Sequence, residues 1–133
     1  MKTFNPIYTI ALLLMFFAMA CTEEETGVED QLIGSWKLSS KTVDDATVTL
    51  SDCEKESIVE LQDYNFCLMI DGCTQDTVYS GWNYTYEMLN ISVLLPAAFY
   101  IEQVDATSLV IKRNDITAEG ELQETILSYT KKP

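Results

Sequence analysis

The sequence predicts an all-β domain at residues 31–133, folded as an antiparallel, up-and-down barrel of roughly eight strands. Three observations lead to this fold class. Short segments rich in β-branched and aromatic residues follow one another, and only tight, polar links separate them. No segment of this region repeats its apolar residues at helical spacing, and most segments have one apolar face. Such a chain is typical of an antiparallel barrel or sandwich.

Nine segments are expected to be strands, each bounded by residues that favour turns. They are 36–43, 47–50, 57–61, 65–70, 78–87, 90–94, 98–104, 109–113 and 122–130. The turns between them include Asp44-Asp45, Asp71-Gly72 and Glu119-Gly120. The short links predict that strands adjacent in sequence pair with each other.

Alternation along a strand indicates which side chains share a face. In segment 65–70, the apolar side chains Phe66, Leu68 and Ile70 lie opposite Cys67 and Met69. A closed barrel needs one apolar face on each strand. With about eight strands, its interior is either filled by side chains or holds one small ligand.

The first 20 residues have the layout of a secretory signal peptide. Lys2 gives a basic start, residues 7–17 are nearly all apolar, and small residues precede Cys21 in the stretch FAMACTEEE. The apolar run is short for a membrane span, which favours a signal peptide. A transmembrane anchor or a buried helix is the alternative interpretation. The Ala-Met-Ala-Cys ending resembles a bacterial lipobox, which implies cleavage before Cys21 and acylation of that cysteine. Residues 21–30 are then expected to form a lipid-anchored, disordered acidic tether.

The acids that follow Cys21 resemble the tag that surface-exported lipoproteins of Bacteroidetes-type bacteria carry behind the lipidated cysteine. This resemblance implies an outer-membrane lipoprotein displayed on the cell surface. The alternative is a plain acidic linker on a lipoprotein that faces the periplasm. In both cases the membrane is an expected partner, to which the N-terminal lipid anchors the protein.

Three cysteines remain once Cys21 is assigned to the lipid, which allows one disulfide and one free thiol. Secretion favours a disulfide. Cys53 and Cys73 both lie in polar, loop-like stretches, whereas Cys67 lies in an apolar strand segment. The expected pairing is Cys53–Cys73, and Cys67–Cys73 is the alternative.

Charge and composition exclude several classes of function. The net charge is −13, from 21 acidic and 8 basic residues, and there is no histidine. Nucleic acid is not an expected partner, because phosphate binding needs clustered Lys and Arg, and here the bases are scattered. Without His, the usual general base and the commonest transition-metal ligand are missing. We therefore expect a protein that is not an enzyme, with no catalytic residues, metal site or cofactor.

The stretch QLIGSWKLSSKTVDD, which contains Gly34-Ser35-Trp36, resembles the Gly-x-Trp opening of lipocalins. The stretches SGWNYTYEMLNISVL, YIEQVDATSLVIKR and ETILSYTKK are similar to the later hairpins and closing strand of lipocalin-like bacterial lipoproteins. The resemblance implies a lipocalin-like barrel in which Gly34 and Trp36 belong to the barrel floor. In lipocalins an Arg of the final strand packs across this Trp. This chain has no Arg there, and Lys131 or Lys132 is the nearest substitute.

The expected function is non-catalytic binding of a small, partly apolar ligand in the barrel mouth. Trp82, Tyr84 and Tyr86, which alternate along segment 78–87, are the candidate cavity residues, because an aromatic wall suits an apolar or flat ligand. The alternative is a structural or interaction module, in which these rings fill the barrel and the loops bind a partner protein or glycan.

Overall fold

The computed structural model describes residues 27–92 and 96–133. The predicted signal peptide, Cys21 and residues 22–26 of the predicted tether lie outside the described residues. No helix in the described ranges is long and apolar enough to cross a membrane.

Most of the described chain is β-strand, and it also contains three short helices. The strands are β1 (Gly34–Val43), β2 (Ala46–Val48), β3 (Ile58–Gln62), β4 (Phe66–Ile70), β5 (Thr77–Thr85), β6 (Met88–Ser92), β7 (Pro96–Val104), β8 (Ser108–Ile116) and β9 (Leu122–Lys131). The helices are α2 (Val28–Leu32) and the 3₁₀ turns η2 (Glu54–Glu56) and η3 (Asp63–Asn65).

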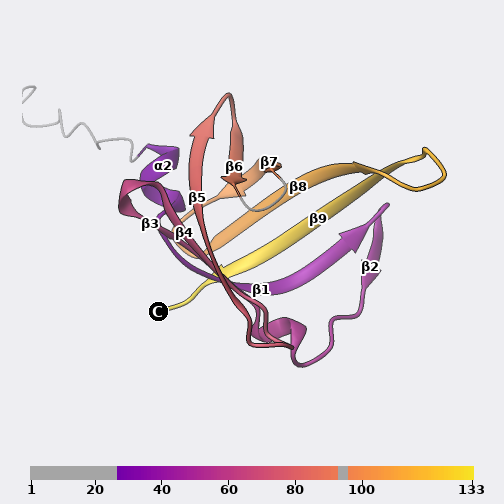
Figure 1. The fold of residues 1–133 in the computed structure, drawn as a ribbon, viewed down its shortest axis with the longest axis horizontal. Coiled ribbons are helices and arrows are strands. Elements are labelled where there is room, and N and C mark those ends of the chain that lie inside the picture. Colours follow the sequence, from indigo (N-terminus) through magenta and orange to yellow (C-terminus); the bar gives the residue numbers. More distant parts are fainter. Residues whose placement is uncertain (1–26, 93–95) are drawn as a thin grey trace, which may run out of the picture.

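The strands form one antiparallel sheet that closes on itself. From β3 to β9 each strand pairs with the next, and β3 also pairs with β1. The barrel closes because β1 pairs with β9, from Trp36 opposite Lys131 to Val43 opposite Thr125. Figure 1 shows β8 and β9 running side by side as a long hairpin, with the β1–β2 hairpin extending in the same direction. Eight strands thus close the barrel, and β2 is an additional strand.

Strand β2 extends the sheet along an edge of β1 that β3 leaves uncovered. Residues Gly34 to Lys37 of β1 pair with β3, whereas Lys41 to Val43 pair with β2. The β1–β2 hairpin turns at Asp44 and Asp45, which both have positive φ (48° and 61°). Asp tolerates this backbone conformation better than most residues, so the turn forms where the sequence predicts it.

The interior of the barrel is apolar, and register decides which face of each strand it takes. Cys67 is 1% exposed and Met69 packs against the core, whereas Phe66 is 60% exposed. The larger apolar face of this strand, with Phe66, Leu68 and Ile70, therefore points outward. In the pairing of β3 with β4, Leu61 lies opposite Cys67 and Val59 lies opposite Met69, so inward-facing residues are side by side. A shift of one strand by one residue would turn its inward-facing side chains outward.

Helix α2 is the first element of the described chain, and it starts three residues before the domain boundary expected from the sequence. Val28 and Leu32 lie one helical turn apart, and both pack against the barrel core. Residues 28–30, expected in the tether, are therefore part of the fold. The helix lies beside the end of β3 that contains Leu61 and Gln62 (Figure 1).

Candidate functional site

The end of the barrel beside α2 is closed by Trp36, which is fully buried. Its indole Nε1 donates a hydrogen bond of 2.8 Å to the Leu32 carbonyl oxygen, and the Lys131 ammonium lies 4.9 Å from the ring centroid. The cation–π contact therefore comes from Lys131, one of the two expected substitutes for Arg. The φ of Gly34 is +145°, a backbone conformation that favours glycine, and a side chain there would also displace the flexible end of Lys131.

The three aromatic residues proposed as a ligand cavity are not brought together. Trp82 is 6% exposed and donates a hydrogen bond of 2.9 Å from Nε1 to the Gln62 carbonyl, which makes it part of the packed core. Tyr84 packs against that core. Tyr86 is 91% exposed, because β5 ends at Thr85 and Tyr86 forms the β5–β6 turn with positive φ. None of the three lines a pocket described below.

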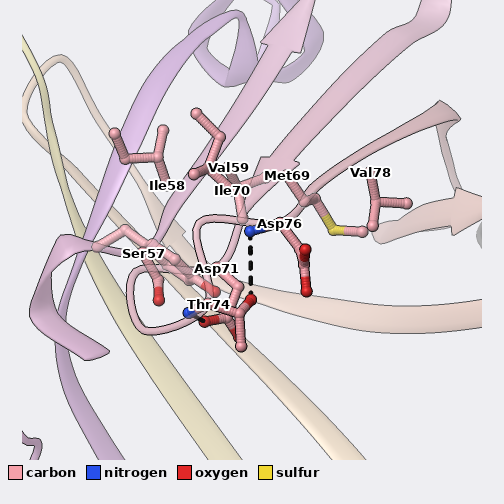
Figure 2. Close-up of a pocket in the computed structure, with 10 residues that line it drawn as sticks. Ser57, Ile58, Val59, Met69, Ile70, Asp71, Thr74, Asp76 and Val78 are labelled. Atoms are coloured by element: carbon pink, nitrogen blue, oxygen red, sulfur yellow. Dashed lines mark hydrogen bonds between the residues drawn. The ribbon is translucent and has the colours of Figure 1, made fainter. Parts of the chain in front are cut away.

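A different pocket, of about 450 Å³, lies at the opposite end of β3 from helix α2 (Figure 2). We call it the strand-end pocket. It is lined by Ser57, Ile58, Val59, Met69, Ile70, Asp71, Thr74, Asp76, Val78 and Tyr129. Apart from Tyr129, these residues come from the start of β3, the end of β4, the β4–β5 loop and the start of β5. A volume of this size suits a small organic molecule.

Strand pairing explains why polar and apolar groups meet in this pocket. Val59, Met69 and Val78 are paired in adjacent strands and share the inward face. Asp76 stands two residues before Val78, so its side chain belongs to the same face. Figure 2 shows the Asp76 carboxylate on the same side as Met69 and Val78. The Asp76 carboxylate therefore lies next to the apolar wall of the pocket.

The β4–β5 loop is held by a disulfide and by close backbone packing. Cys53 and Cys73 are joined, which confirms the expected pairing, and Cys67 is left as a buried free thiol. The Gly72 N–H donates a hydrogen bond of 3.0 Å to Ser57 Oγ. A Cβ at Gly72 would overlap the Cys53 carbonyl oxygen and lie 2.7 Å from the Ser57 nitrogen, so only glycine lets the two loops approach this closely.

Asp71 organises the loop and carries a negative charge at the rim of the pocket. Its Oδ1 accepts hydrogen bonds from the backbone N–H groups of Cys73 (2.8 Å) and Thr74 (2.9 Å). These bonds favour the ionised form, and they hold the pKa of the Asp71 carboxyl below its usual value. Asp71 also raises the pKa of Glu54, although hydrogen bonds from Ser51 outweigh this effect and lower it. Glu54 is therefore a third carboxylate near the rim.

Tyr129 of β9 is a buried residue whose hydroxyl is accessible in the pocket. The residue is 8% exposed and belongs to the core cluster, yet it lines the pocket. Within the described part of the chain its hydroxyl has no hydrogen-bond partner. Burial raises the pKa of Tyr129 to about 12, and the nearby Cys67 adds to the rise. The hydroxyl is therefore a neutral group that can still form a hydrogen bond to a guest molecule.

Cys67 does not have the properties of a reactive thiol. Burial raises its pKa to about 11, so almost none of it is thiolate at neutral pH. Among residues 27–92 and 96–133, no group of three or more His, Cys, Asp or Glu side chains is arranged to hold a metal ion. The arrangement around the pocket suits binding: an apolar wall, one accessible hydroxyl without a partner and a rim of carboxylates.

A second hollow, of about 500 Å³, lies between β3 and the segment that follows helix α2. It is lined by Ile33, Gly34, Ser35, Glu60, Leu61, Gln62, Asp63 and Tyr64. The one buried residue of this lining is the apolar Leu61, whereas the buried Tyr129 presents a polar hydroxyl to the strand-end pocket. The strand-end pocket is therefore the stronger candidate site.

Sequence reasoning missed Tyr129 and Asp76 as pocket residues. Tyr129 alternates with Leu127 in β9, a signal that it faces inward, but alternation does not say which strands it will face. Asp76 stands in a polar link between strands, where Asp is ordinarily a turn residue. Its place in the pocket lining depends on how β4 and β5 pair on either side of this link.

Comparison with known proteins gives a match in structure alone. No protein-family model and no curated protein sequence matches the chain. Bovine odorant binding protein complexed with its natural ligand superposes with a TM-score of 0.50 and 12% identity, over 84% of this chain and 77% of that chain. The complex of bovine odorant binding protein with a selenium-containing odorant gives a TM-score of 0.51 and 14% identity, over 86% of this chain and 78% of that chain.

These bovine proteins are lipocalins, so the fold class expected from the sequence is confirmed. The chain is an all-β, closed antiparallel barrel of eight strands with one extra strand, and it matches the lipocalin fold. At 12% and 14% identity the likeness concerns the fold. What the barrel does has to be argued from its own pocket.

Proposed function

We propose that this chain binds a small, partly apolar molecule, without catalysis, in the strand-end pocket. One observation carries the proposal: a pocket of about 450 Å³ opens onto the core and contains the unpartnered hydroxyl of Tyr129, a side chain only 8% exposed. Because this hydroxyl is accessible in the pocket and has no partner in the described chain, it can form a hydrogen bond to a bound molecule. The fold supports the proposal, since both bovine structures are described as complexes with a ligand or odorant.

A pocket-filling variant tests this proposal. Val78 lines the pocket and is 43% exposed, so Val78→Trp should fill the space with little disturbance of the core. The probe is a neutral dye whose fluorescence rises in apolar surroundings. We expect the wild-type chain to bind it and Val78→Trp to lose most of that binding.

The matched control is Val48→Trp, because Val48 is similarly exposed (38%) but lies on β2, away from the pocket. This variant should bind the dye as the wild type does. Equal binding by all three proteins, or by none of them, contradicts the proposal. Native mass spectrometry of protein purified from its own cells would then identify a retained ligand by its mass.

An interaction module is a second candidate function, and two loop tips favour it. Tyr64 is 93% exposed in the β3–β4 loop, and Tyr86 is 91% exposed in the β5–β6 turn. Exposed tyrosines at loop tips are suited to stacking on a glycan or packing against a protein. If this is the function, the double variant Tyr64→Ser, Tyr86→Ser should abolish binding on a glycan array or cross-linking on intact cells. Val78→Trp should leave both unchanged.

We also propose that the domain is held at the outer membrane, facing the cell surface, by a lipid on Cys21. The layout of the first 20 residues and the acids after Cys21 support this location. Cells that express the wild type should incorporate a palmitate label into the protein, and Cys21→Ser should abolish the label. Protease treatment of intact cells then distinguishes surface display from a periplasmic orientation.

A further inference from the structure

The strand-end pocket is acidic on one side. Asp71 and Asp76 are among the ten described residues that line it, and none of those ten is basic. Glu54 lies close enough to Asp71 for the two charges to interact. The charge of Lys41 helps to lower the pKa of Glu54, and Lys37 forms an ion pair of 2.8 Å with Glu56. Neither lysine is among the residues that line the pocket.

The Asp76 side chain supplies the carboxylate that is free to bind a ligand. Its backbone groups serve the loop: the N–H donates to Thr74 Oγ1 (3.2 Å), and the carbonyl accepts from the Asp71 N–H (3.0 Å). Its carboxylate has no hydrogen bond or ion pair within the described residues. It is exposed and lines the pocket beside Met69 and Val78 (Figure 2). Asp71 differs, because its carboxylate is already bonded to the loop.

The buried side of the same pocket is neutral and mostly apolar. Val59 and Met69 pack against the core, and the Tyr129 hydroxyl is the unpartnered polar group there. A guest would therefore meet apolar side chains and one neutral hydroxyl on the core side, and carboxylates at the rim. This distribution disfavours an anion, whose charge would face Asp71 and Asp76 without a cation among the lining residues.

We propose that the ligand of this pocket is an amphiphilic organic cation: an apolar body that lies against Val59, Met69 and Val78, with an ammonium or guanidinium group at the Asp76 carboxylate. This inference rests on the proposed function and adds the chemical class of the ligand.

Three probes with the same chain and different head groups test the charge preference. Octylamine, octanol and octanoate are compared by displacement of the neutral dye from the full chain at neutral pH. We expect octylamine to bind about tenfold more tightly than octanol, because one partly exposed charge pair contributes up to ~1 kcal/mol and a second acid adds to it. Octanoate should bind more weakly than octanol. Added salt should weaken the binding of octylamine and leave that of octanol unchanged.

Asp76→Asn tests the residue assignment. It should weaken octylamine binding about fivefold and leave octanol binding unchanged, and Asp76→Glu should restore most of the loss. The matched control is Asp45→Asn at the β1–β2 turn, which removes the same unit of net charge and keeps a residue type that tolerates the positive φ of 61°. This control should bind all three probes as the wild type does.

The outcomes separate the two proposals. If octanol displaces the dye but octanoate binds as tightly as octylamine, the cation preference is wrong and the ligand pocket stands. The same conclusion follows if Asp76→Asn and salt both leave octylamine binding unchanged. If neither the dye nor any of the three probes binds, the proposed function itself is wrong.

Discussion

Tyr129 is a buried residue that lines the pocket, and its raised pKa makes the stability of the fold depend on pH. Its pKa is raised from 10 to about 12, chiefly by burial. The neutral form is therefore favoured in the folded chain by roughly 3 kcal/mol relative to the unfolded chain. This stability is fully present below pH 10 and is lost as the pH rises through about 12. Cys67, whose thiol pKa is also raised by burial, acts with the same sign.

A titration of phenolate absorbance measures this directly. The titration should contain a step with a midpoint near pH 12, and Tyr129→Phe should lack that step. The free energy of unfolding of Tyr129→Phe should also fall less steeply above pH 10 than that of the wild type. If the wild type and the variant titrate alike, the pKa of Tyr129 is not raised.

Gly34 is the residue whose replacement should most directly disturb the closed end of the barrel. Gly34→Ala places a Cβ on the Lys131 stem and a side chain at a φ of +145°. We expect a loss of about 1–3 kcal/mol in the free energy of unfolding, measured in urea. Gly81→Ala is the control, since its Cβ would meet only the Asn65 carbonyl oxygen at 3.6 Å, an ordinary contact. Equal stability of the two variants would contradict the role given to Gly34.

At the scale of elements, the β4–β5 loop depends on its link to the η2 segment. The Cys53–Cys73 disulfide closes a loop with a sequence separation of 20. By loop-entropy reasoning, reduction should lower the free energy of unfolding by roughly 3 kcal/mol. The measurement is urea unfolding with and without a reductant. The double variant Cys53→Ala, Cys73→Ala should be insensitive to the reductant; if it responds as the wild type does, another bond is responsible.

Most strands could be predicted from the sequence, because alternation and turn residues are local properties. The segments 98–104, 109–113 and 122–130 all lie within the observed strands β7, β8 and β9. Helix α2 was not predicted. Its five residues are too few to form a stable helix alone, and it exists because Val28 and Leu32 pack on the barrel.

At the scale of the whole molecule, α2 and the closed end should behave as one unit. A chain that begins at Gly27 should unfold with the same free energy as one that begins at Cys21. A chain that begins at Ile33 loses Leu32, which is fully buried and accepts the Trp36 hydrogen bond. By analogy with core truncations, we expect a loss of about 2–5 kcal/mol.

Urea unfolding and tryptophan fluorescence check this prediction, since Trp36 should become exposed and its emission should shift to the red. Leu32→Ala in the longer chain serves as the control and should shift both readings in the same direction. Full stability of the chain that begins at Ile33 would show that the helix is not part of the domain.

The candidate site was the part that the sequence predicted least. Alternation placed Trp82, Tyr84 and Tyr86 on one face, but the turn at Tyr86 and Glu87 ends the strand first, and Trp82 lies within the packed core. The residues that do line the pocket come from β3, β4 and β5 and, across the barrel, from β9. Which strands face each other across a closed barrel is a long-range property, so local pattern could not identify them.

By itself, the sequence determined that the domain consists of short antiparallel strands joined by tight turns and that Cys53 and Cys73 stand in loops, because turn chemistry and alternation act over a few residues. The tertiary structure alone decided that Cys67 and Met69 face inward, that Lys131 packs on Trp36, and that Asp76 and Tyr129 meet at one pocket. These outcomes depend on register and on closure of β1 against β9, where segments distant in the chain bury their apolar faces together.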